Sequence, residues 1–186
     1  MYFVASRLTA PIRILTGVVT LGIAIIGCSP TASSNATPTV TEIVDGDTVV
    51  INFAGQHETV RLLGIDTPET VDPNRPIQCF GAEASQYISA LVPPGTEVFV
   101  ERDIEARDRF GRLLVYLYRK SDGLFINAAM LEQGFADLAI HQPNNAYGTE
   151  LENALTPART QARGLWSVCG GPDVALDPPP ASEESQ

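Results

Sequence analysis

The sequence has no apolar run long enough to cross a membrane as a helix, and it has few cysteines and few basic residues. Its longest uncharged, mostly apolar segment, Ile14 to Gly27, is about 14 residues long, whereas a spanning helix needs about 20. Arg7 and Arg13 precede or flank that segment and are the only charges in the first thirty residues. A basic flank followed by a short apolar core is typical of an export signal.

The apolar segment ends in Ile25-Ile26-Gly27-Cys28, which resembles the lipobox of bacterial lipoprotein signals. We therefore expect residues 1–27 to be removed as a signal peptide and Cys28 to be lipidated. The protein would then be exported and lipid-anchored to the cell membrane or outer membrane, facing the periplasm or the exterior. An ordinary signal peptide that happens to contain a cysteine, or an uncleaved anchor, is the alternative.

The composition on either side of residues 40–169 cannot build a core. Residues 28–39 combine the lipidated cysteine with small, uncharged polar residues, which indicates a flexible tether. Residues 170–186 are rich in proline and acids and contain no base, which predicts a disordered acidic tail. Residues 40–169 are therefore the expected globular domain, of a typical size for one domain.

The sequence contains three cysteines. If Cys28 carries lipid, Cys79 and Cys169 remain, and an even pair in an oxidising compartment predicts a disulfide. Such a bridge closes a loop of about 90 residues and stabilises by about 4 kcal/mol in the loop-entropy view. Two separate free thiols are the alternative.

Basic residues are scarce. Without Arg7 and Arg13, ten basic residues face 22 acidic ones, a net charge of −12. This balance argues against a tight, passive nucleic-acid binder, because phosphate contacts dominate such affinity. It argues less against an enzyme, which needs only local positive charge and a metal. The local exception is a run of eleven residues that holds four arginines: Arg102, Arg107, Arg109 and Arg112.

Hydrophobic patterns predict an α+β domain. Alternation and β-branched residues predict a meander of three strands between residues 40 and 65, with turns at 45–46 and 54–56, and two later strands at 98–100 and 113–118. Apolar residues at helical spacing predict helices near 84–91, 124–133 and 149–163. Pro157 is expected to kink or split the last helix, with Thr156 capping its second half, and Gly134 to follow the second. This order suggests a five-stranded barrel with packed helices.

Two segments offer oxygen ligands for a hard cation. Asp45-Gly46-Asp47 lies at the first turn, and Asp66-Thr67-Pro68-Glu69 directly follows the third strand. Neighbouring strands of a meander can bring Asp47 and Asp66 together, and Arg61 and Arg112 can grip one phosphate from two directions. Each piece alone has a plain alternative: a turn, a helix cap or an exposed strand charge.

In this order, the motifs resemble those of the staphylococcal nuclease (thermonuclease) family. The similarity covers nearly all of residues 40–169. It is carried by residues 44–48, 61–70, 80–85, 108–112 and 142–145, and it extends to residues 164–166. The resemblance implies an OB-fold five-stranded β-barrel with three packed α-helices. It also implies Ca²⁺-dependent cleavage of single-stranded or denatured DNA and of RNA at the 5′-O–P bond, which leaves 3′-phosphates.

The resemblance also assigns roles by position. Asp47, Asp66 and the backbone carbonyl of Thr67 would hold Ca²⁺. Glu69 would orient or deprotonate the attacking water, and Arg61 and Arg112 would bind the phosphate. All five charged side chains are present.

This sequence departs from the family at two substrate-pocket tyrosines, which are replaced by Phe110 and Ala139. The change concerns end recognition and substrate affinity rather than metal chemistry. Substrate contacts are expected from Arg109, Phe110 and His141, with Tyr116 or Tyr118 as alternative replacements. Arg75 is either a solvated side chain or a further phosphate contact. Phe110 is the expected base-stacking residue.

A monomeric nuclease is the expected function, since no exposed apolar stripe is left over once the core is assigned. Two other classes of protein were weighed. A non-catalytic OB-type module that binds nucleic acid or protein would usually have lost the acids or the arginines, and this chain retains both. A structural lipoprotein of the envelope explains the anchor and tether but not the charged motifs.

Overall fold

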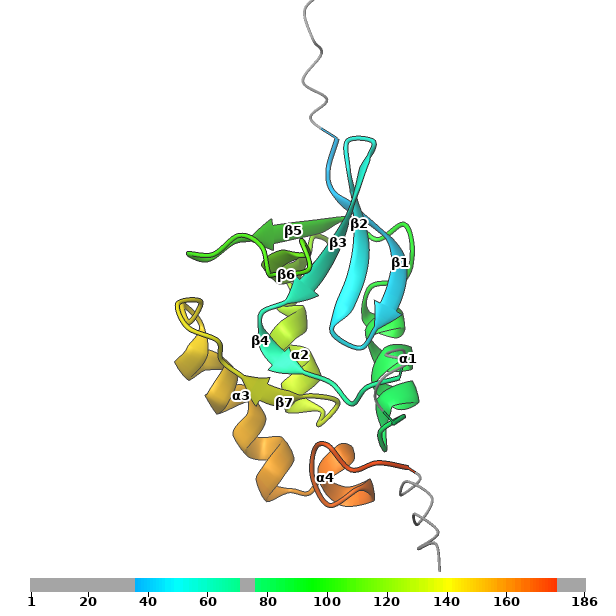
Figure 1. Ribbon diagram of the computed structural model, residues 1–186, viewed down its shortest axis with the longest axis vertical. Helices are drawn as coiled ribbons and strands as arrows, with labels where there is room; N and C mark the ends of the chain where they lie inside the picture. Colours follow the sequence, from blue (N-terminus) through cyan, green and yellow to red (C-terminus); the bar gives the residue numbers. More distant parts are fainter. Residues whose placement is uncertain (1–35, 71–75, 177–186) are drawn as a thin grey trace, which may run out of the picture. The chain divides into compact units, whose positions relative to one another are not determined.

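The structure, a computed structural model, describes residues 36–70 and 76–176 and begins with a meander of three antiparallel strands (Figure 1). These are β1 (Thr39–Asp45), β2 (Thr48–Phe53) and β3 (Gln56–Leu62). The predicted signal peptide, Cys28, most of the tether, Arg75 and the end of the tail lie outside the described residues. The meander places the Asp45-Gly46-Asp47 turn at one end of the sheet, as the sequence predicts.

Two later strands complete the main sheet. β3 pairs in parallel with β6 (Leu113–Arg119), and β6 pairs antiparallel with β5 (Val98–Glu101), giving the order β1-β2-β3-β6-β5. In the described part of the chain, β1 and the segment that leads into β5 form no strand ladder. They meet at one isolated bridge, Thr39 with Glu97, and at backbone hydrogen bonds from Val40 N to Thr96 O, Gly95 N to Val40 O and Val98 N to Pro38 O. A barrel needs a continuous ladder between its edge strands. The predicted barrel is therefore wrong: the domain is α+β with an OB-like five-stranded sheet that is not closed.

The third predicted strand is divided in two. After β3 ends at Leu62, β4 (Gly64–Asp66) pairs antiparallel with β7 (Asp137–Ala139) in a separate two-stranded sheet. Gly64 has φ +76°, and a Cβ there would clash with the side chain of Leu151. Glycine therefore permits both the turn and the close approach of the last long helix. Asp66 consequently ends a strand that has left the main sheet.

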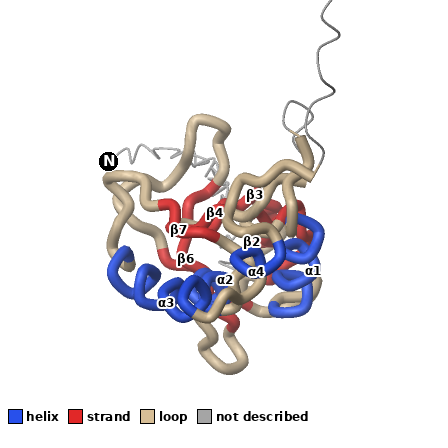
Figure 2. The backbone as a smooth tube through the Cα atoms, turned by 90° about the horizontal axis from the view of Figure 1, so that it is seen from below, coloured by secondary structure: helices blue, strands red, loops and turns tan. Residues whose placement is uncertain are grey.

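Three predicted helices are present: α1 (Gly81–Leu91), α2 (Ile126–Glu132) and α3 (Gly148–Thr160), followed by a short helix, α4 (Leu165–Val168). In Figure 2, α1 and α3 lie on opposite sides of the domain. Gly134 follows α2 with φ +75°, as its predicted role as a C′ residue requires. No helix of the described residues combines the length and apolar character needed to span a membrane.

The sequence predicts that Pro157 kinks or splits the last helix, and the split is wrong. Helix α3 runs through Pro157 to Thr160, and the hydroxyl of Thr156 donates to the carbonyl oxygen of Glu152 at 2.9 Å instead of capping a new helix. Proline costs a helix the hydrogen bond of its missing N–H. The missing bond is the one to the carbonyl oxygen of Asn153, and α3 continues past it to Thr160 without a break.

The core lies between the sheet and the helices. Val49, Ile51 and Leu62 from the strands and Ile88 from α1 are fully or almost fully buried. One polar side chain lies among them: Asn127 of α2 is fully buried, accepts from Leu117 N at 2.9 Å and donates to Leu63 O at 2.8 Å. Its amide satisfies two backbone groups at the junction of the sheet and α2, as buried polar groups require.

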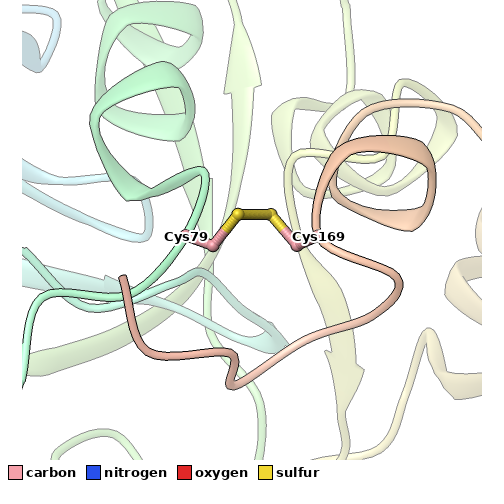
Figure 3. The surroundings of a disulfide bond; sticks show 2 residues. All are labelled: Cys79 and Cys169. Carbon is pink, nitrogen blue, oxygen red and sulfur yellow. A yellow bond between two sulfur atoms is a disulfide. The ribbon is translucent and has the colours of Figure 1, made fainter. Parts of the chain in front are cut away.

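The first residues of the predicted tail belong to the fold. The amide N–H of Cys79 donates to Val174 O at 2.7 Å, and that of Leu176 donates to Ile77 O at 3.0 Å. Cys79 and Cys169 form the predicted disulfide, which joins the segment before α1 to the segment after α4 (Figure 3). The domain therefore extends beyond Cys169, because the disulfide holds residues 170–176 against residues 77–79.

We expect the double substitution Cys79→Ser and Cys169→Ser to lower the free energy of unfolding. The disulfide joins residues that are 90 positions apart in the sequence. Removing a crosslink across such a loop costs about 4 kcal/mol through the entropy of the unfolded chain. Urea unfolding followed by circular dichroism measures the difference. Reduced wild-type protein should match the variant, and a difference below about 1 kcal/mol would contradict this account.

Candidate active site

A cavity of about 540 Å³ opens where the first hairpin, the segment after β4 and the arginine-rich loop meet. Its lining includes the whole set of residues predicted for catalysis and metal binding: Asp47, Arg61, Asp66, Thr67, Glu69 and Arg112. The predicted substrate-binding residues Arg109 and Phe110 also line it. The fold thus brings together residues from four separate segments, while their chemical roles stay predictions.

Strand pairing brings Asp47 to Arg61. Thr48 pairs with Arg61 across β2 and β3, and the amide N–H of Leu62 donates to the backbone carbonyl oxygen of Asp47 at 2.9 Å. The turn also packs closely on the segment after β4, since a Cβ added at Gly46 would lie 2.8 Å from Thr67 Oγ1. Glycine at position 46 is therefore needed for the close approach of the two acidic segments.

Arg61 lies between the two predicted metal-binding carboxylates. Its Nη2 is 3.0 Å from Asp47 Oδ2 and 2.9 Å from Asp66 Oδ1. Its Nη1 donates to the backbone carbonyl oxygens of Leu62 at 2.6 Å and Ile65 at 2.8 Å. Both terminal amino groups of Arg61 are therefore engaged within the protein. The sequence predicts that Arg61 binds the phosphate. The structure adds that Arg61 connects the two acidic segments by contacting Asp47 and Asp66.

The oxygen atoms beside Arg61 suit a hard cation. Asp47 is held by the amide N–H of Thr67 at 3.1 Å and by the hydroxyl of Thr48 at 2.8 Å. Thr67 is buried, and its Oγ1 has no hydrogen-bond partner among the described residues. Carboxylate, carbonyl and water oxygens are the ligands that Ca²⁺ prefers. The described residues contain no cluster of three or more His, Cys, Asp or Glu side chains that could hold a metal. A cation between Asp47 and Asp66 would therefore take further oxygen ligands from Thr67 and water.

The loop that carries Glu69 is fixed by hydrogen bonds that the sequence did not predict. The amide N–H of Thr70 donates to Glu69 Oε1 at 3.0 Å. The backbone of Glu69 forms two further bonds with Gln78: Glu69 N donates to Gln78 Oε1 at 2.7 Å, and Gln78 N donates to Glu69 O at 2.9 Å. Gln78 is buried. The position of the Glu69 side chain therefore depends on a residue from outside the acidic segment.

Asp45 supports the same loop from the opposite side. Its Oδ1 accepts hydrogen bonds from Gly46 N at 2.8 Å, from the hydroxyl of Thr70 at 2.8 Å and from the hydroxyl of Ser85 at 3.0 Å. Burial raises the pKa of the Asp45 carboxyl, and these three hydrogen bonds oppose the increase. Asp45 thus connects the first turn to the Glu69 loop and to α1. The sequence offered it as an oxygen ligand, and nothing local indicated Ser85 as its partner.

Arg112 is held by a carboxylate four residues before it. Asp108 Oδ2 accepts from Arg112 Nε at 2.7 Å, while Asp108 Oδ1 accepts from Arg112 N at 2.9 Å and Phe110 N at 3.0 Å. This contact uses Nε and leaves the Nη groups of Arg112 out of it. Arg107 attaches the loop to β3 through Glu58, with Nη1 to Oε2 at 2.8 Å and Nη2 to Oε1 at 2.9 Å. These bonds hold the loop against β3 and hold Arg112 at the lining of the cavity.

A second cavity, of about 510 Å³, adjoins the first. Both are lined by Arg61, Arg109, Phe110 and Arg112. The ring of Phe110 is 69% exposed, with the guanidinium carbons of Arg109 and Arg112 4.7 and 5.4 Å from its centroid. An exposed aromatic ring between cationic groups suits base stacking beside a phosphate.

The second cavity contains His141 and Ala139, so the structure places His141 there and not at the predicted metal site. The tyrosines weighed as replacements do not line either cavity. Tyr116 is buried, with its hydroxyl donating to Asp103 Oδ2 at 3.0 Å, and Tyr118 stacks on Phe125. Both therefore support the sheet instead of the substrate pocket.

We expect stability to fall in acid because of Asp103 and Asp108. Burial raises the pKa of each carboxyl, but hydrogen bonds outweigh it and lower the pKa: Asp103 accepts from Ala146 N and Tyr116, and Asp108 accepts from Arg112. A carboxyl with a lowered native pKa stabilises the fold above its unfolded pKa, and that contribution is lost as the pH falls through the native value.

The loss is therefore expected below about pH 4, the unfolded pKa of aspartate. Urea unfolding at a series of pH values measures it. Asp108→Asn should show a shallower decrease than wild type, whereas Glu83→Gln, an exposed position on α1, should follow wild type. Equal slopes for Asp108→Asn and wild type would contradict the assignment.

Comparison with known proteins finds one matching family and several similar nucleases. The family described as "Staphylococcal nuclease homologue" matches residues 59–168. The chain is 35% identical to the thermonuclease of Staphylococcus intermedius over 83% of this chain and 98% of that protein. It is 33% identical to the thermonuclease of Staphylococcus hyicus over 69% of this chain and 74% of that protein. It is 34% identical to endonuclease YncB of Bacillus subtilis over 71% of this chain and 62% of that protein.

Proposed function

We propose that this chain, which belongs to the staphylococcal nuclease family, is a Ca²⁺-dependent nuclease that hydrolyses DNA and RNA at the 5′-O–P bond and leaves 3′-phosphates. The observation that carries the proposal is the convergence of two carboxylates, a third acid and two arginines on one cavity. Relatives named as thermonucleases and endonucleases support it.

Asp47, Asp66 and the carbonyl oxygen of Thr67 are the proposed Ca²⁺ ligands. A bound Ca²⁺ would neutralise charge on the phosphate oxygens and favour deprotonation of a nearby water. The buried hydroxyl of Thr67, which has no hydrogen-bond partner within residues 36–70 and 76–176, and the two carboxylates beside it fit an oxygen-only site. Arg61 keeps the two carboxylates in place, since it contacts both.

Glu69 is the proposed group that orients the attacking water and takes its proton. It lines the same cavity as the carboxylates. Its backbone N–H and its backbone carbonyl oxygen are both hydrogen-bonded to Gln78. Arg112 contributes positive charge toward the phosphate, because Asp108 fixes its Nε and leaves its terminal amino groups for substrate oxygens. Charge that develops on those oxygens in the transition state is then stabilised by a preorganised cation.

The substrate is proposed to be single-stranded or denatured nucleic acid. Phe110 and the arginines around it lie between the two cavities, so one nucleotide's phosphate and base can be held on either side of the ring. His141 lines the second cavity, where it can contact the base or sugar. Stacking of this kind tolerates any base and does not depend on the 2′-hydroxyl, which fits cleavage of both DNA and RNA.

Release of acid-soluble nucleotides from denatured DNA tests the proposal. The chain from Ser29 to Gln186 is assayed with Ca²⁺, with Mg²⁺ and with a chelator, beside Glu69→Ala and Arg112→Ala. Release that requires Ca²⁺ and that both variants largely abolish would support the enzyme. A folded wild-type chain that releases nothing but retains DNA in chelator would instead favour a non-catalytic binding module.

We also propose that the protein is exported as a monomer anchored to a membrane through lipid on Cys28. The support is the lipobox-like Ile25-Ile26-Gly27-Cys28 sequence and the uncharged tether that follows it. Metabolic labelling with radioactive palmitate tests the anchor. Label in the full chain but not in Cys28→Ala is expected, and unlabelled, freely released wild-type protein would refute it.

A further inference from the structure

Two short segments, residues 77–79 and 173–176, connect to the Glu69 loop through hydrogen bonds. Residues 77–79 bond to the backbone of Glu69, and residues 173–176 bond to residues 77–79: Gln78 forms an isolated bridge with Ala175, and Cys79 N donates to Val174 O at 2.7 Å. Neither segment contributes a residue to the lining of the first cavity. The pair of segments thus supports the catalytic loop without entering the site.

Gln78 is the connection between the loop and the outer segment. Its side-chain oxygen accepts from Glu69 N at 2.7 Å, and its side-chain nitrogen donates to Asp173 Oδ1 at 3.0 Å. A backbone N–H on one side and a carboxylate on the other allow only one orientation of the amide. Gln78 is 7% exposed, so water cannot readily replace either partner. The side chain is therefore fixed at both ends.

Asp173 is in turn fixed by the disulfide. Cys169 lies four residues before Asp173 and is covalently joined to Cys79, the neighbour of Gln78 (Figure 3). Asp173 has φ +59°, a conformation that aspartate and asparagine adopt more readily than other residues with a side chain. The backbone and the crosslink together hold the Asp173 carboxylate against the amide of Gln78.

We propose that Gln78 is a positioning residue for Glu69, with Asp173 and the Cys79–Cys169 disulfide as its outer support. The inference rests on the proposed role of Glu69 in the reaction. A group that handles the attacking water must be held within a fraction of an ångström, and a displacement of about 1 Å costs about 100-fold in rate. Residues that fix the reacting group are therefore as necessary as the group itself.

Loss of Gln78 would not release the whole loop. Thr70 remains bonded to Asp45, and a Cβ at Gly81 would lie 2.9 Å from the carbonyl oxygen of Pro68, so α1 packs closely on the loop. Asp47 and Arg61 also keep their own contacts. The expected consequence is thus specific: the turnover rate falls, while substrate affinity and Ca²⁺ requirement change little.

A reciprocal exchange of the two side chains tests the contact. Gln78→Ala removes both side-chain bonds, to Glu69 N and Asp173 Oδ1, and keeps the backbone bond from Gln78 N to Glu69 O. Gln78→Glu keeps an acceptor for Glu69 N but places a carboxylate against Asp173. Adding Asp173→Asn to Gln78→Glu restores a donor opposite that carboxylate, with the same net charge as wild type. Asn127→Ala is the matched control, since it removes a buried amide with two backbone bonds elsewhere.

Steady-state kinetics of the full chain, purified in detergent, give the first readout, on denatured DNA in Ca²⁺. We expect Gln78→Ala and Gln78→Glu to lower kcat by about 10-fold to 100-fold with little change in KM. The Gln78→Glu/Asp173→Asn protein should recover most of the wild-type kcat. A kcat for Gln78→Ala equal to that of Asn127→Ala, or no recovery in the double variant, would overturn the proposal.

Hydrogen exchange of the Glu69 amide gives a second readout that does not depend on activity. The amide should exchange faster in Gln78→Ala and Gln78→Glu, and at the wild-type rate in the double variant, whereas Asn127→Ala leaves it protected. Unchanged protection in Gln78→Ala would also overturn the proposal. A wild-type chain without nuclease activity would contradict the proposed function, and the exchange result would still decide the positioning contact.

Discussion

Replacing Glu69 with Gln is expected to lower kcat by about 100-fold to 10,000-fold, the usual contribution of a positioned general base. The substitution keeps the shape of the side chain and an oxygen that can accept from Thr70 N, which is 3.0 Å from Glu69 Oε1 in wild type. What it removes is the negative charge and the ability to take a proton. Because position is preserved, the decrease reports on chemistry rather than on a displaced loop.

Single-turnover cleavage of a short oligonucleotide at saturating Ca²⁺ measures the effect, with KM from steady-state assays. We expect KM to stay close to wild type, since the substitution leaves unchanged the proposed substrate contacts Arg109, Phe110 and Arg112, which line both cavities. Glu83→Gln in α1 makes the same change of charge at an exposed position and should cleave at the wild-type rate. A Glu69→Gln protein that keeps more than about a tenth of kcat would exclude proton transfer by Glu69.

The sequence predicted the charged set of this site because those residues lie in short, local motifs. Asp47 belongs to a turn, Asp66 ends β4 and Glu69 follows it, and Arg112 directly precedes β6. In each case the strand that carries the residue could be recognised from β-branched residues and turn signals. A meander then brings consecutive strands together, which is why the sequence predicted that Asp47 and Asp66 lie close to each other; the contact of Arg61 with both was not predicted.

The contacts that fix these residues could not be predicted in the same way. Gln78 and Asp173 are 95 positions apart, and no local pattern distinguishes a glutamine that supports a loop from one that faces solvent. The same holds for Asp45 and Ser85, 40 positions apart. Composition also misled at the end of the domain: residues 170–176 resemble a solvated tail, but the disulfide and the pairing with residues 77–79 hold them to the fold.

Strand breaks were the other difference. Thr59 to Ile65 has the composition of one strand, yet Gly64 adopts a positive φ and diverts β4 to pair with β7. β7 has only three residues, too few for alternation to be visible. The diversion depends on the packing of Leu151 against Gly64, which is tertiary information. Closure of the sheet likewise depends on how β1 and β5 approach each other, and in the described residues their contact is one bridge and a few backbone hydrogen bonds, not a ladder.

Arg61→Ala is expected to reduce both activity and stability, and the loss of stability should depend on Ca²⁺. Its guanidinium contacts two carboxylates and two carbonyl oxygens, with only 15% of the Arg61 side chain exposed and 10% of Asp47. Removing one partner of a largely buried charge network costs about 3 kcal/mol or more, because the remaining charges stay desolvated. Asp66 is 48% exposed, so solvent screening places the expected cost at the lower end of that range.

Ca²⁺ should recover part of this loss. In chelator, the variant lacks both Ca²⁺ and the Arg61 guanidinium that contacts Asp47 and Asp66 in wild type. A bound cation supplies positive charge at the same carboxylates, and ligand at about 100 times its dissociation constant stabilises a folded protein by about 2.7 kcal/mol. The difference between wild type and Arg61→Ala should therefore be smaller in Ca²⁺ than in chelator. A group that served only to bind the phosphate would show no difference in the absence of substrate.

Urea unfolding of both proteins in millimolar Ca²⁺ and in chelator makes the comparison, and Arg107→Ala is the matched control. Arg107 is also paired with a carboxylate, through two hydrogen bonds to Glu58. Its side chain is 47% exposed, however, and Glu58 is not one of the two proposed metal ligands. An exposed pair contributes less than about 1 kcal/mol, and its loss should be the same with and without Ca²⁺. Equal losses for Arg61→Ala in both conditions would mean that Arg61 does not share its carboxylates with the metal, and Asp47 and Asp66 would then no longer be the preferred ligand pair.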